Sequence, residues 1–269
     1  MLSNLSIPVI TFTSPGAVAF HIGSLTIRWY GIFVAAGFLA VYVLSERLII
    51  HNWKGEVTSP LQHFHDMIFF MLIFSVIFAR LWFVFLSWDY FKDHLSEIPK
   101  IWHGGQSIHG GMFGAVISAI LYSKIKKISF YSYIDLFSVS APLGQAIGRW
   151  GNFFNNEAFG RPVNNWIFKL SVPREFRPDQ FINIDYFHPT FFYESFLDFV
   201  IFVFLYKKYS NWKEKKGKIF WMYLLCYSII RFFLELLRVD SLYLFDHFAS
   251  AHVVSVTIVV VSLYFLFKR

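Results

Sequence analysis

Seven long runs of apolar residues constrain the fold of this chain more than any other feature. A helix that crosses a bilayer needs about 20 predominantly apolar residues, and each run is close to that length. The third and fourth are short or glycine-rich and carry polar residues. The runs occupy residues 29–50, 64–86, 108–123, 131–150, 189–206, 218–237 and 249–267. They predict an all-α polytopic membrane protein with seven transmembrane helices.

The composition agrees with a chain that lipid surrounds. Of 269 residues, 56% are hydrophobic and only 15% are charged, whereas a soluble domain has about 25% charged residues. A soluble chain this apolar does not have enough polar residues to cover its core, but a membrane protein exposes apolar side chains to lipid. No internal repeat divides the sequence, so residues 1–269 are expected to form a single integral membrane domain.

The net charge of +7 would suit a nucleic-acid-binding protein, but its distribution indicates membrane topology and no nucleic acid partner. Lys and Arg concentrate in cytoplasmic loops. Thirteen lie in one set of short alternate loops and at the C-terminus, eight lie in the longer other set, and three lie within apolar runs. The dense set is Arg47, Lys54, Lys124, Lys126, Lys127, Lys207, Lys208, Lys213, Lys215, Lys216, Lys218, Lys268 and Arg269. This places the N-terminus outside and the C-terminus in the cytoplasm.

The longest polar stretch, residues 151–188, falls on the outer side in this topology. It contains Gly160, Pro162, Pro173 and Pro178, and it is too polar and too interrupted to span a bilayer. Long loops in compact proteins are usually functional or mobile. We expect this stretch to form a small extracytoplasmic head segment.

Charged residues recur along the sixth run. Tyr227, Arg231 and Glu235 are spaced by four residues and Arg238 follows three later, so the four lie in one stripe of a helix. One interpretation is an Arg–Glu pair that neutralises itself and joins two helices. The other is an anion site, because two arginines against one glutamate leave a positive charge near the outer boundary, where an arginine fork suits phosphate.

The end of the fourth run gathers several polar residues in a short space. Arg149, Asn152, Asn155, Asn156 and Glu157 follow one another closely, with glycines at 148, 151 and 160. A helix cap requires one or two such residues, and the concentration of all of them favours a functional site. Asp135 lies about 21 Å from Arg149 along the helix at 1.5 Å per residue, so we expect it to be structural.

Two histidines stand at the outer ends of other runs. His109 is flanked by glycines at a helix start, where the helix N-terminus favours a neutral imidazole that can accept a proton. His188 precedes Pro189 and Thr190, with Tyr193 and Glu194 one turn further on. Either histidine alone is equally compatible with loop or helix-boundary chemistry, since glycine pairs and a proline at the first helical position are common there.

Several chemistries are disfavoured by what the sequence lacks. It contains no nucleophile elbow, no His-Glu-x-x-His helix, no Walker loop and no dinucleotide-binding glycine pattern. The single cysteine, Cys226, excludes an intramolecular disulfide and argues against a cysteine metal site. We therefore expect no metal and no soluble cofactor.

Together these motifs resemble the prolipoprotein diacylglyceryl transferase family over about residues 20–265. The most specific part is a dense motif at the end of the fourth run, and position 156 is one where other members carry different residues. The matching segments are Arg28-Trp29-Tyr30-Gly31, Ser107-Ile108-His109-Gly110-Gly111, Gly148-Arg149-x-Gly151-Asn152-Phe153-x-Asn155-x-Glu157-x-x-Gly160, His188-Pro189-Thr190 with Tyr193-Glu194, and Tyr227-x-x-x-Arg231-x-x-x-Glu235-x-x-Arg238.

The resemblance implies a bacterial cytoplasmic membrane enzyme with seven spans and an outer N-terminus. Such enzymes transfer the diacylglyceryl group of phosphatidylglycerol to the thiol of the lipobox cysteine in a preprolipoprotein signal peptide. The products are a thioether-linked lipid and glycerol 1-phosphate. The partners expected on this basis are phosphatidylglycerol, the signal peptide and the surrounding membrane lipid.

The residue types suit that reaction. Displacing a phosphate ester requires stabilisation of the leaving charge, for which Arg149 and Arg231 are the candidates. The thiol must become a thiolate, and His109 is the preferred general base, with Glu157 or Glu235 as alternatives. Gly160 would shape the chain around the headgroup. The residues expected to bind substrate are Tyr30, Asn152, Gly160, Tyr227, Glu235 and Arg238.

A transporter or channel for an anionic solute is the main alternative, because its pathway would also be lined by charged residues. It predicts polar stripes that reach both sides of the membrane. In this sequence the polar motifs gather on the outer half, which favours chemistry on a lipid headgroup. Another lipid-modifying enzyme ranks next, and a purely structural scaffold last, because it leaves the surplus arginines unexplained.

Overall fold

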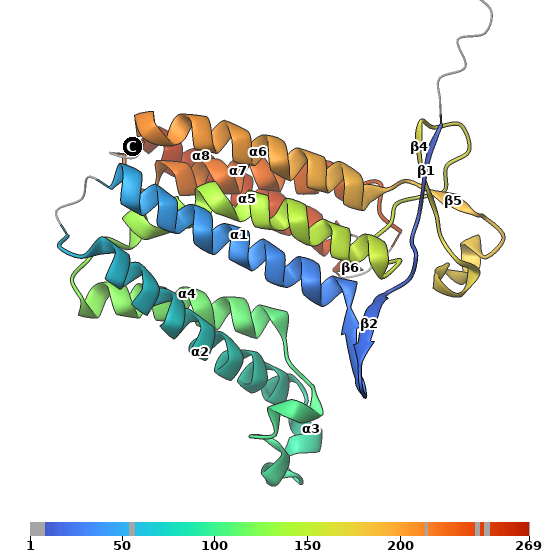
Figure 1. The fold of residues 1–269 in the computed structure, drawn as a ribbon, viewed down its shortest axis with the longest axis horizontal. Helices are drawn as coiled ribbons and strands as arrows, with labels where there is room; N and C mark the ends of the chain where they lie inside the picture. Colours follow the sequence, from blue (N-terminus) through green and yellow to red (C-terminus); the bar gives the residue numbers. More distant parts are fainter. Residues whose placement is uncertain (1–8, 54–56, 213–214, 240–242, 245–247, 269) are drawn as a thin grey trace, which may run out of the picture. The chain divides into compact units, whose positions relative to one another are not determined.

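The computed structural model describes residues 9–53, 57–212, 215–239, 243–244 and 248–268. Among them the chain is mostly helical (Figure 1). The helices are α1 (Trp29–Asn52), α2 (Pro60–Leu86), α3 (Trp88–Phe91), α4 (Ile108–Ile125), α5 (Phe130–Phe154), α6 (Thr190–Trp212), α7 (Lys218–Glu235) and α8 (Ser250–Lys268). Each of the seven apolar runs coincides with one of the long helices. Lys54, Lys213 and Arg269, which enter the charge count, lie outside the described residues.

Four helices of the described part are long and apolar enough to cross a membrane, namely α1, α2, α4 and α8. This identifies a polytopic membrane protein by length and composition. Helices α5, α6 and α7 have the length of a span, but acidic and basic side chains interrupt their apolar character. Those side chains include Arg149, Glu194, Asp198 and Arg231.

The chain divides into two compact units. The first unit contains residues 1–45 and 135–269, and the second contains residues 46–134. The expectation of a single membrane domain stays a prediction.

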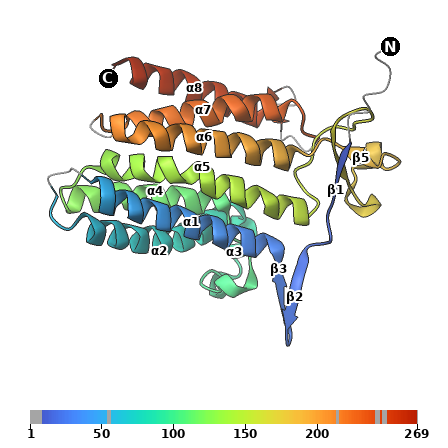
Figure 2. The ribbon, with the colours of Figure 1, turned by 45° about the horizontal axis from the view of Figure 1, so that its top comes forward.

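In the first unit α1 contacts α5 at a pair of glycines and a pair of serines. Helices α6, α7 and α8 lie side by side (Figure 2). Gly37 of α1 and Gly144 of α5 allow these two helices to approach closely, because a Cβ on Gly37 would lie 2.8 Å from the Gly144 carbonyl oxygen. The Ser45 and Ser140 hydroxyls are 2.7 Å apart between the same helices. At the start of α7, the Asp135 carboxylate accepts hydrogen bonds from the Gly217 and Phe220 amides, which confirms its structural role.

The second unit is built on α2 and α4, which lie side by side. The Phe113 ring of α4 packs 5.9 Å from both Phe78 and Trp82 of α2. Between the two helices the chain forms α3 and two short 3₁₀ turns, η1 (Leu95–Glu97) and η2 (Ile101–His103). This connecting segment leads directly to the predicted His109 motif.

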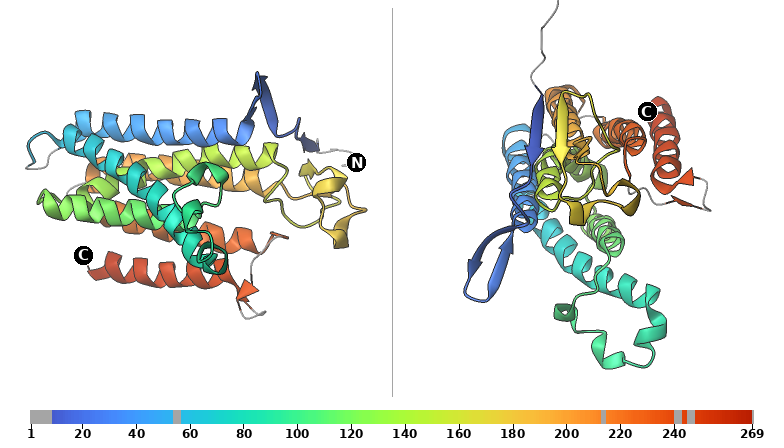
Figure 3. Two further views of the ribbon diagram at one scale, coloured as in Figure 1. Left: turned by 90° about the horizontal axis from the view of Figure 1, so that it is seen from below. Right: turned by 90° about the vertical axis from the view of Figure 1, so that its right-hand side faces the viewer.

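Short strands occur outside the long helices and were not predicted by the sequence analysis. β2 (Val18–Ile22) and β3 (Leu25–Arg28) form an antiparallel hairpin that runs into the start of α1 (Figure 3). β1 (Ile10–Thr13) pairs in parallel with β4 (Phe168–Ser171), and β4 pairs with β5 (Tyr186–Phe187). β6 (Tyr243–Leu244) pairs with β7 (Phe248–Ala249). The longest strand has five residues, so its sequence pattern is too short to be recognised locally.

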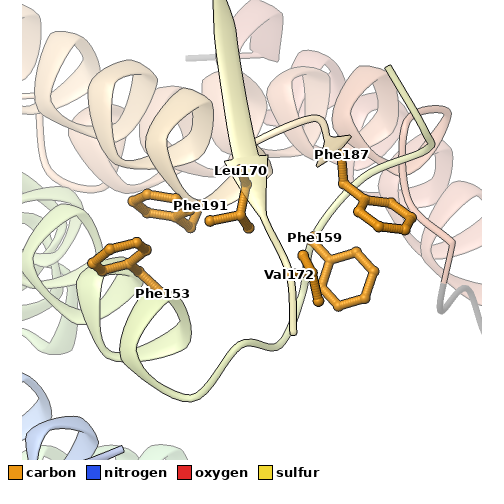
Figure 4. Packing of buried hydrophobic residues seen from close by; sticks show 6 residues of the cluster. All are labelled: Phe153, Phe159, Leu170, Val172, Phe187 and Phe191. Atoms are coloured by element: carbon orange, nitrogen blue, oxygen red, sulfur yellow. The ribbon is translucent and has the colours of Figure 1, made fainter. Parts of the chain in front are cut away.

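The predicted head segment, residues 151–188, contains β4, β5 and two 3₁₀ turns, η3 (Arg174–Phe176) and η4 (Asp179–Phe181). Buried apolar side chains from this segment pack with Phe191 of α6 and with Phe153 of α5, whose rings stack 4.9 Å apart (Figure 4). The cluster contains Phe153, Phe159, Leu170, Val172, Phe187 and Phe191. It fixes the ends of α5 and α6 to the segment that carries the polar motif.

Candidate functional site

A connected polar network surrounds the C-terminal end of α5 in the first unit. Arg149 Nη2 lies 2.5 Å from the buried Glu194 Oε1 of α6. Arg149 Nη1 donates to Asn152 Oδ1 (3.4 Å), and Asn152 Nδ2 donates to Glu157 Oε1 (2.8 Å). Asn155 Nδ2 also reaches Glu157 Oε1 at 3.4 Å. The predicted polar residues therefore form one chain of contacts from α6 to the exit of α5.

The turn after α5 adopts an uncommon backbone conformation. Asn156 and Ala158 have φ values of 52° and 57°, and a positive φ is unusual for a residue with a Cβ. The Thr190 hydroxyl at the start of α6 donates a short hydrogen bond to the Ala158 carbonyl. The His-Pro-Thr motif thus holds the turn that presents Glu157.

Gly160 lies where three of the predicted motifs meet. Its amide donates to the His188 carbonyl (2.9 Å), and it forms an isolated β-bridge with Arg238. A Cβ on Gly160 would lie 2.8 Å from His188 Cβ and 2.9 Å from the Leu237 carbonyl oxygen. The absence of a side chain at Gly160 is therefore what lets the segments from α5, α6 and α7 approach one another.

The stripe on α7 forms an ion-pair cluster. Arg231 Nη2 lies 2.6 Å from the buried Glu235 Oε2, and Arg238 Nε lies 3.9 Å from the same oxygen. Arg231 Nη1 is buried and has no hydrogen-bond partner among the described residues. One glutamate therefore contacts two arginines, as the spacing predicted, and one buried guanidinium nitrogen has no protein partner among the described residues.

Tyr227 connects the two arginine groups. It lies within hydrogen-bonding reach of Arg149 and close enough to Arg231 to interact with its charge. Tyr227, Ser228 and Arg231 also line a cavity of about 260 Å³ whose other wall comes from α8. Arg149 and Arg231 thus approach the same tyrosine within one unit.

Tyr30 enters the first unit's site from α1. Its ring packs on Gly151, where an added Cβ would lie 2.9 Å from Tyr30 Cδ2, and the side chain remains exposed. The neighbouring Trp29 stacks on Phe154 with centroids 4.9 Å apart. These contacts hold Tyr30 at the turn of α5 that carries Arg149 and Asn152.

His188 forms part of a small aromatic group at the N-terminal end of α6. Its Nδ1 and the Tyr193 hydroxyl are 3.2 Å apart, and Trp166 Nε1 donates to that hydroxyl at 2.7 Å. Burial disfavours the charged imidazole and lowers the pKa of His188 below its ordinary value. This supports a neutral, structural histidine at the junction.

His109 belongs to the second unit, where it is the second residue of α4 and is exposed. Ser107 caps the helix, since its Oγ accepts from the Gly110 amide at 3.5 Å. The helix therefore begins where the sequence predicted. Of the predicted site residues, all but His109 lie in the first unit.

The first unit's site can bind an anion. Its ion pairs match three guanidinium groups with Glu194 and Glu235, and side-chain amides and tyrosines surround them. Arginine forks suit phosphate oxygens. The arrangement fits chemistry at a phosphate ester more than transfer through the bilayer.

Comparison with known proteins agrees with this chemistry. The family model described as prolipoprotein diacylglyceryl transferase matches residues 17–268. The chain belongs to the prolipoprotein diacylglyceryl transferase family.

Three relatives, each named phosphatidylglycerol–prolipoprotein diacylglyceryl transferase, show how far the similarity of this family member extends. A Fervidobacterium nodosum protein is 44% identical over 246 residues, which cover 90% of this chain and 81% of the relative. A Staphylococcus epidermidis protein is 41% identical over 94% of this chain and 88% of its own length. A Staphylococcus aureus protein is 39% identical over 97% and 91% respectively.

Two acidic residues of this family member were not assigned a role by the sequence analysis. Glu194 is part of the motif that begins at His188, and the structure shows that it is the direct partner of Arg149. Asp198, one turn further along α6, is 0% exposed, and neither of its oxygens has a hydrogen-bond partner among the described residues. The i, i+4 spacing of two acids in an apolar run was the available signal.

Proposed function

We propose that the chain transfers the diacylglyceryl group of phosphatidylglycerol to a prolipoprotein. Family membership and the names of the relatives support this activity. The observation that carries it is the convergence of three polar segments, from α5, α6 and α7, on paired arginines with a free donor at Arg231. A lipid with an anionic phosphodiester suits such a site.

The acceptor in this proposal is the thiol of the lipobox cysteine in the signal peptide. The thiolate attacks the glycerol carbon that carries the phosphate, so an S–C bond forms and the C–O bond breaks. The electron pair of that bond passes to the phosphate oxygen, and glycerol 1-phosphate leaves. The thiol proton goes to a base, and no metal or soluble cofactor takes part.

Arg149 and Arg231 are proposed to stabilise the phosphate as its charge increases, with Arg238 in support. Preorganised donors aimed at a developing charge are often the largest catalytic contribution. Glu194 and Glu235 hold the two guanidinium groups in fixed directions. The unpartnered Arg231 Nη1 is the donor offered to a phosphate oxygen.

His109 is proposed as the general base, since its exposed imidazole at a helix start can reach a substrate. General bases typically contribute about 10²–10⁴-fold. Glu157 is the alternative, because it is exposed and receives hydrogen bonds from two amides. Glu235 suits the role less well, because it is buried between two arginines.

The headgroup is proposed to contact Tyr30, Asn152 and Tyr227, which border the arginines. Glu235 and Arg238 complete the site, and Gly160 allows its segments to meet. The ring of Tyr30 on Gly151 and the amide of Asn152 between Arg149 and Glu157 support this assignment.

The proposal places the chain in the bacterial cytoplasmic membrane with seven spans, an outer N-terminus and a cytoplasmic C-terminus. The seven long helices and the dense basic loops between alternate helices support it. Residues 151–188 then form an extracytoplasmic head segment. Its buried cluster with Phe153 and Phe191 supports a segment anchored at the outer ends of α5 and α6.

A reconstituted assay tests the proposed activity. The purified protein in phosphatidylglycerol vesicles is expected to add one diacylglyceryl mass to a lipobox peptide and to release an equal amount of glycerol 1-phosphate. A peptide with serine in place of the lipobox cysteine and vesicles without phosphatidylglycerol are the controls. An unmodified cysteine peptide, from protein whose helical content and thermal unfolding are intact, would reject the proposal.

A further inference from the structure

Arg80 is a buried arginine of α2 that no proposed reaction step uses. It is 6% exposed, and among the described residues it forms no ion pair with a carboxylate. The nearby Glu97 carboxylate contacts Lys100 at 2.6 Å and His103 at 2.7 Å instead. A charged group within an apolar helix is costly unless its donors are satisfied.

All the donors that Arg80 uses are directed at main-chain carbonyls of the segment before α4. Its Nη2 donates to Glu97 (2.7 Å) and its Nε to Ile98 (2.9 Å). Its Nη1 donates to Gly104 (2.6 Å) and Gly105 (3.0 Å). One planar side chain therefore joins the two ends of the segment 97–105.

The guanidinium is held on its other sides by aromatic rings and by a close glycine. Its Cζ lies 5.1 Å from the Phe91 centroid and 5.9 Å from the Phe83 centroid. Gly105 has a φ of 74°, and a Cβ there would lie 2.4 Å from the Phe83 ring and 2.9 Å from Arg80 Nη1. The contact leaves no space for a side chain at position 105.

The segment 97–105 leads directly into the first turn of α4. The Ser107 amide donates to the carbonyl of Ala79, the residue next to Arg80, at 3.0 Å. Ser107 is the N-cap of α4, and His109 is two residues further on. The path from Arg80 to His109 is thus short and lies wholly within the second unit.

We propose that Arg80 is a positioning residue that fixes the segment 97–105 and thereby the start of α4 and the direction of His109. This inference rests on the proposed function, in which His109 is the base. A lysine cannot replace Arg80, because a compact ammonium does not reproduce the planar fork that spans carbonyls at both ends of the segment.

Hydrogen exchange on the purified full chain tests the anchoring without any substrate. In Arg80→Lys the amides of Gly104, Ser107 and Gly111, which donate to main-chain carbonyls, are expected to exchange at least about tenfold faster. Gly105→Ala is expected to do the same from the other side of the contact. Unchanged exchange at these amides in both variants would overturn the proposal.

Arg177→Lys is the matched control. Arg177 also donates to two main-chain carbonyls, Val172 at 2.8 Å and Ile182 at 3.0 Å, but it does so in the first unit. Arg177 also forms an ion pair with Asp185 at 2.7 Å. Its substitution is therefore expected to speed exchange within residues 172–185 only and to leave the rate of transfer unchanged. Equal loss of activity in Arg177→Lys and Arg80→Lys would show a general effect on folding and would overturn the positioning role.

Steady-state kinetics then test whether Arg80 affects the reaction by positioning His109. Arg80→Lys is expected to lower kcat about 10- to 100-fold with KM for lipid and peptide within about twofold of the original. Added to His109→Gln, it should slow the reaction by no more than about twofold, because the two residues act as one unit. Effects that multiply in the double variant, a wild-type kcat in Arg80→Lys, or a rise in KM alone would overturn the inference.

The failure of this inference can be separated from the failure of the proposed function. If the unaltered chain does not modify the peptide, the proposed function fails, while exchange still decides whether Arg80 anchors the segment. If His109→Gln is fully active, the base assignment fails and the positioning role fails with it. If transfer and the base assignment both stand and exchange is unchanged in Arg80→Lys, only the role of Arg80 fails.

Discussion

Arg149 and Arg231 in the first unit and Arg80 in the second are the three arginines that the sequence places within apolar runs, and they are satisfied differently. Arg149 and Arg231 contact buried glutamates and remain partly exposed, with 23% and 22% of their side-chain surface accessible. Arg80 is buried and bonds main-chain carbonyls. One nitrogen of Arg231, Nη1, has no hydrogen-bond partner among the described residues, whereas all three guanidinium nitrogens of Arg80 donate to carbonyls. We interpret the first arrangement as a ligand site and the second as a scaffold.

The largest effect is expected at the ion-paired arginines. Arg149→Lys and Arg231→Lys should each reduce transfer about 10²- to 10³-fold, because a lysine loses the fork that donates to phosphate. Lysine is preferable to alanine, since removing one partner of a buried pair costs about 3–5 kcal/mol. The steady-state rate with the lipobox peptide measures the effect.

Arg174→Lys, at an exposed position of the head segment, is the control and should keep the original rate. Near-normal transfer by both Arg149→Lys and Arg231→Lys would mean that the fork is not required. The division between ligand-binding and scaffold arginines would then be wrong.

A second contrast lies between two glycines of the same motif. Gly160→Ala should lower transfer about 10- to 100-fold, because the new Cβ would displace His188 or Leu237 and shift groups that must be placed precisely. Gly148 lies within α5 and nothing is within 4 Å of a Cβ there, so Gly148→Ala should keep activity and stabilise the helix by about 0.5–1 kcal/mol. Equal losses in both variants would argue against the junction at Gly160.

The two neighbouring acids of α6 offer a comparison of stability. Glu194→Gln removes the partner of Arg149 and is expected to lower the free energy of unfolding by about 3 kcal/mol. Asp198→Asn replaces a carboxylate with no hydrogen-bond partner among the described residues, so its cost should be below about 1 kcal/mol. Thermal unfolding of the purified variants measures both, and the reverse order would contradict the assigned pairing.

The smallest effect concerns pH at the junction of the head segment. Burial lowers the pKa of His188 in the folded chain. As the pH falls below the ordinary pKa of about 6.5, His188 is therefore protonated in the unfolded chain before it is protonated in the folded one. Stability from the neutral imidazole is therefore complete above that pH and declines as pH falls toward the lowered pKa. His188→Asn should reduce the loss of thermal stability between pH 7.5 and pH 5.5, and an unchanged loss would count against this origin.

The helices followed from sequence because apolar runs of span length are local signals, and all seven are present. The pairing of Arg231 with Glu235 followed in the same way from a spacing of four residues. The pairing of Arg149 with Glu194 could not be predicted from the sequence, because the two residues are 45 positions apart and only packing brings α5 and α6 together. The pairing of β1 with β4 likewise joins segments about 160 residues apart that no local pattern connects.

The role of Arg80 was also beyond the sequence, because its partners are main-chain carbonyls, which every residue carries. Nothing in the amino-acid sequence from Glu97 to Gly105 distinguishes a segment that is anchored by an arginine from an unanchored loop. A glycine pair such as Gly104 and Gly105 is typical of a turn, and only the structure shows that Gly105 lies against the guanidinium.

The most direct test of the central claim measures how strongly the protein prefers an anionic lipid head. Equilibrium binding of phosphatidylglycerol and of phosphatidylcholine to the purified chain should show a clear preference for the anionic lipid. In Arg231→Lys, the affinity for phosphatidylglycerol should fall at least about tenfold while binding of phosphatidylcholine is unchanged. Equal affinity for the two lipids in the unaltered chain, or an undiminished preference in Arg231→Lys, would contradict the account.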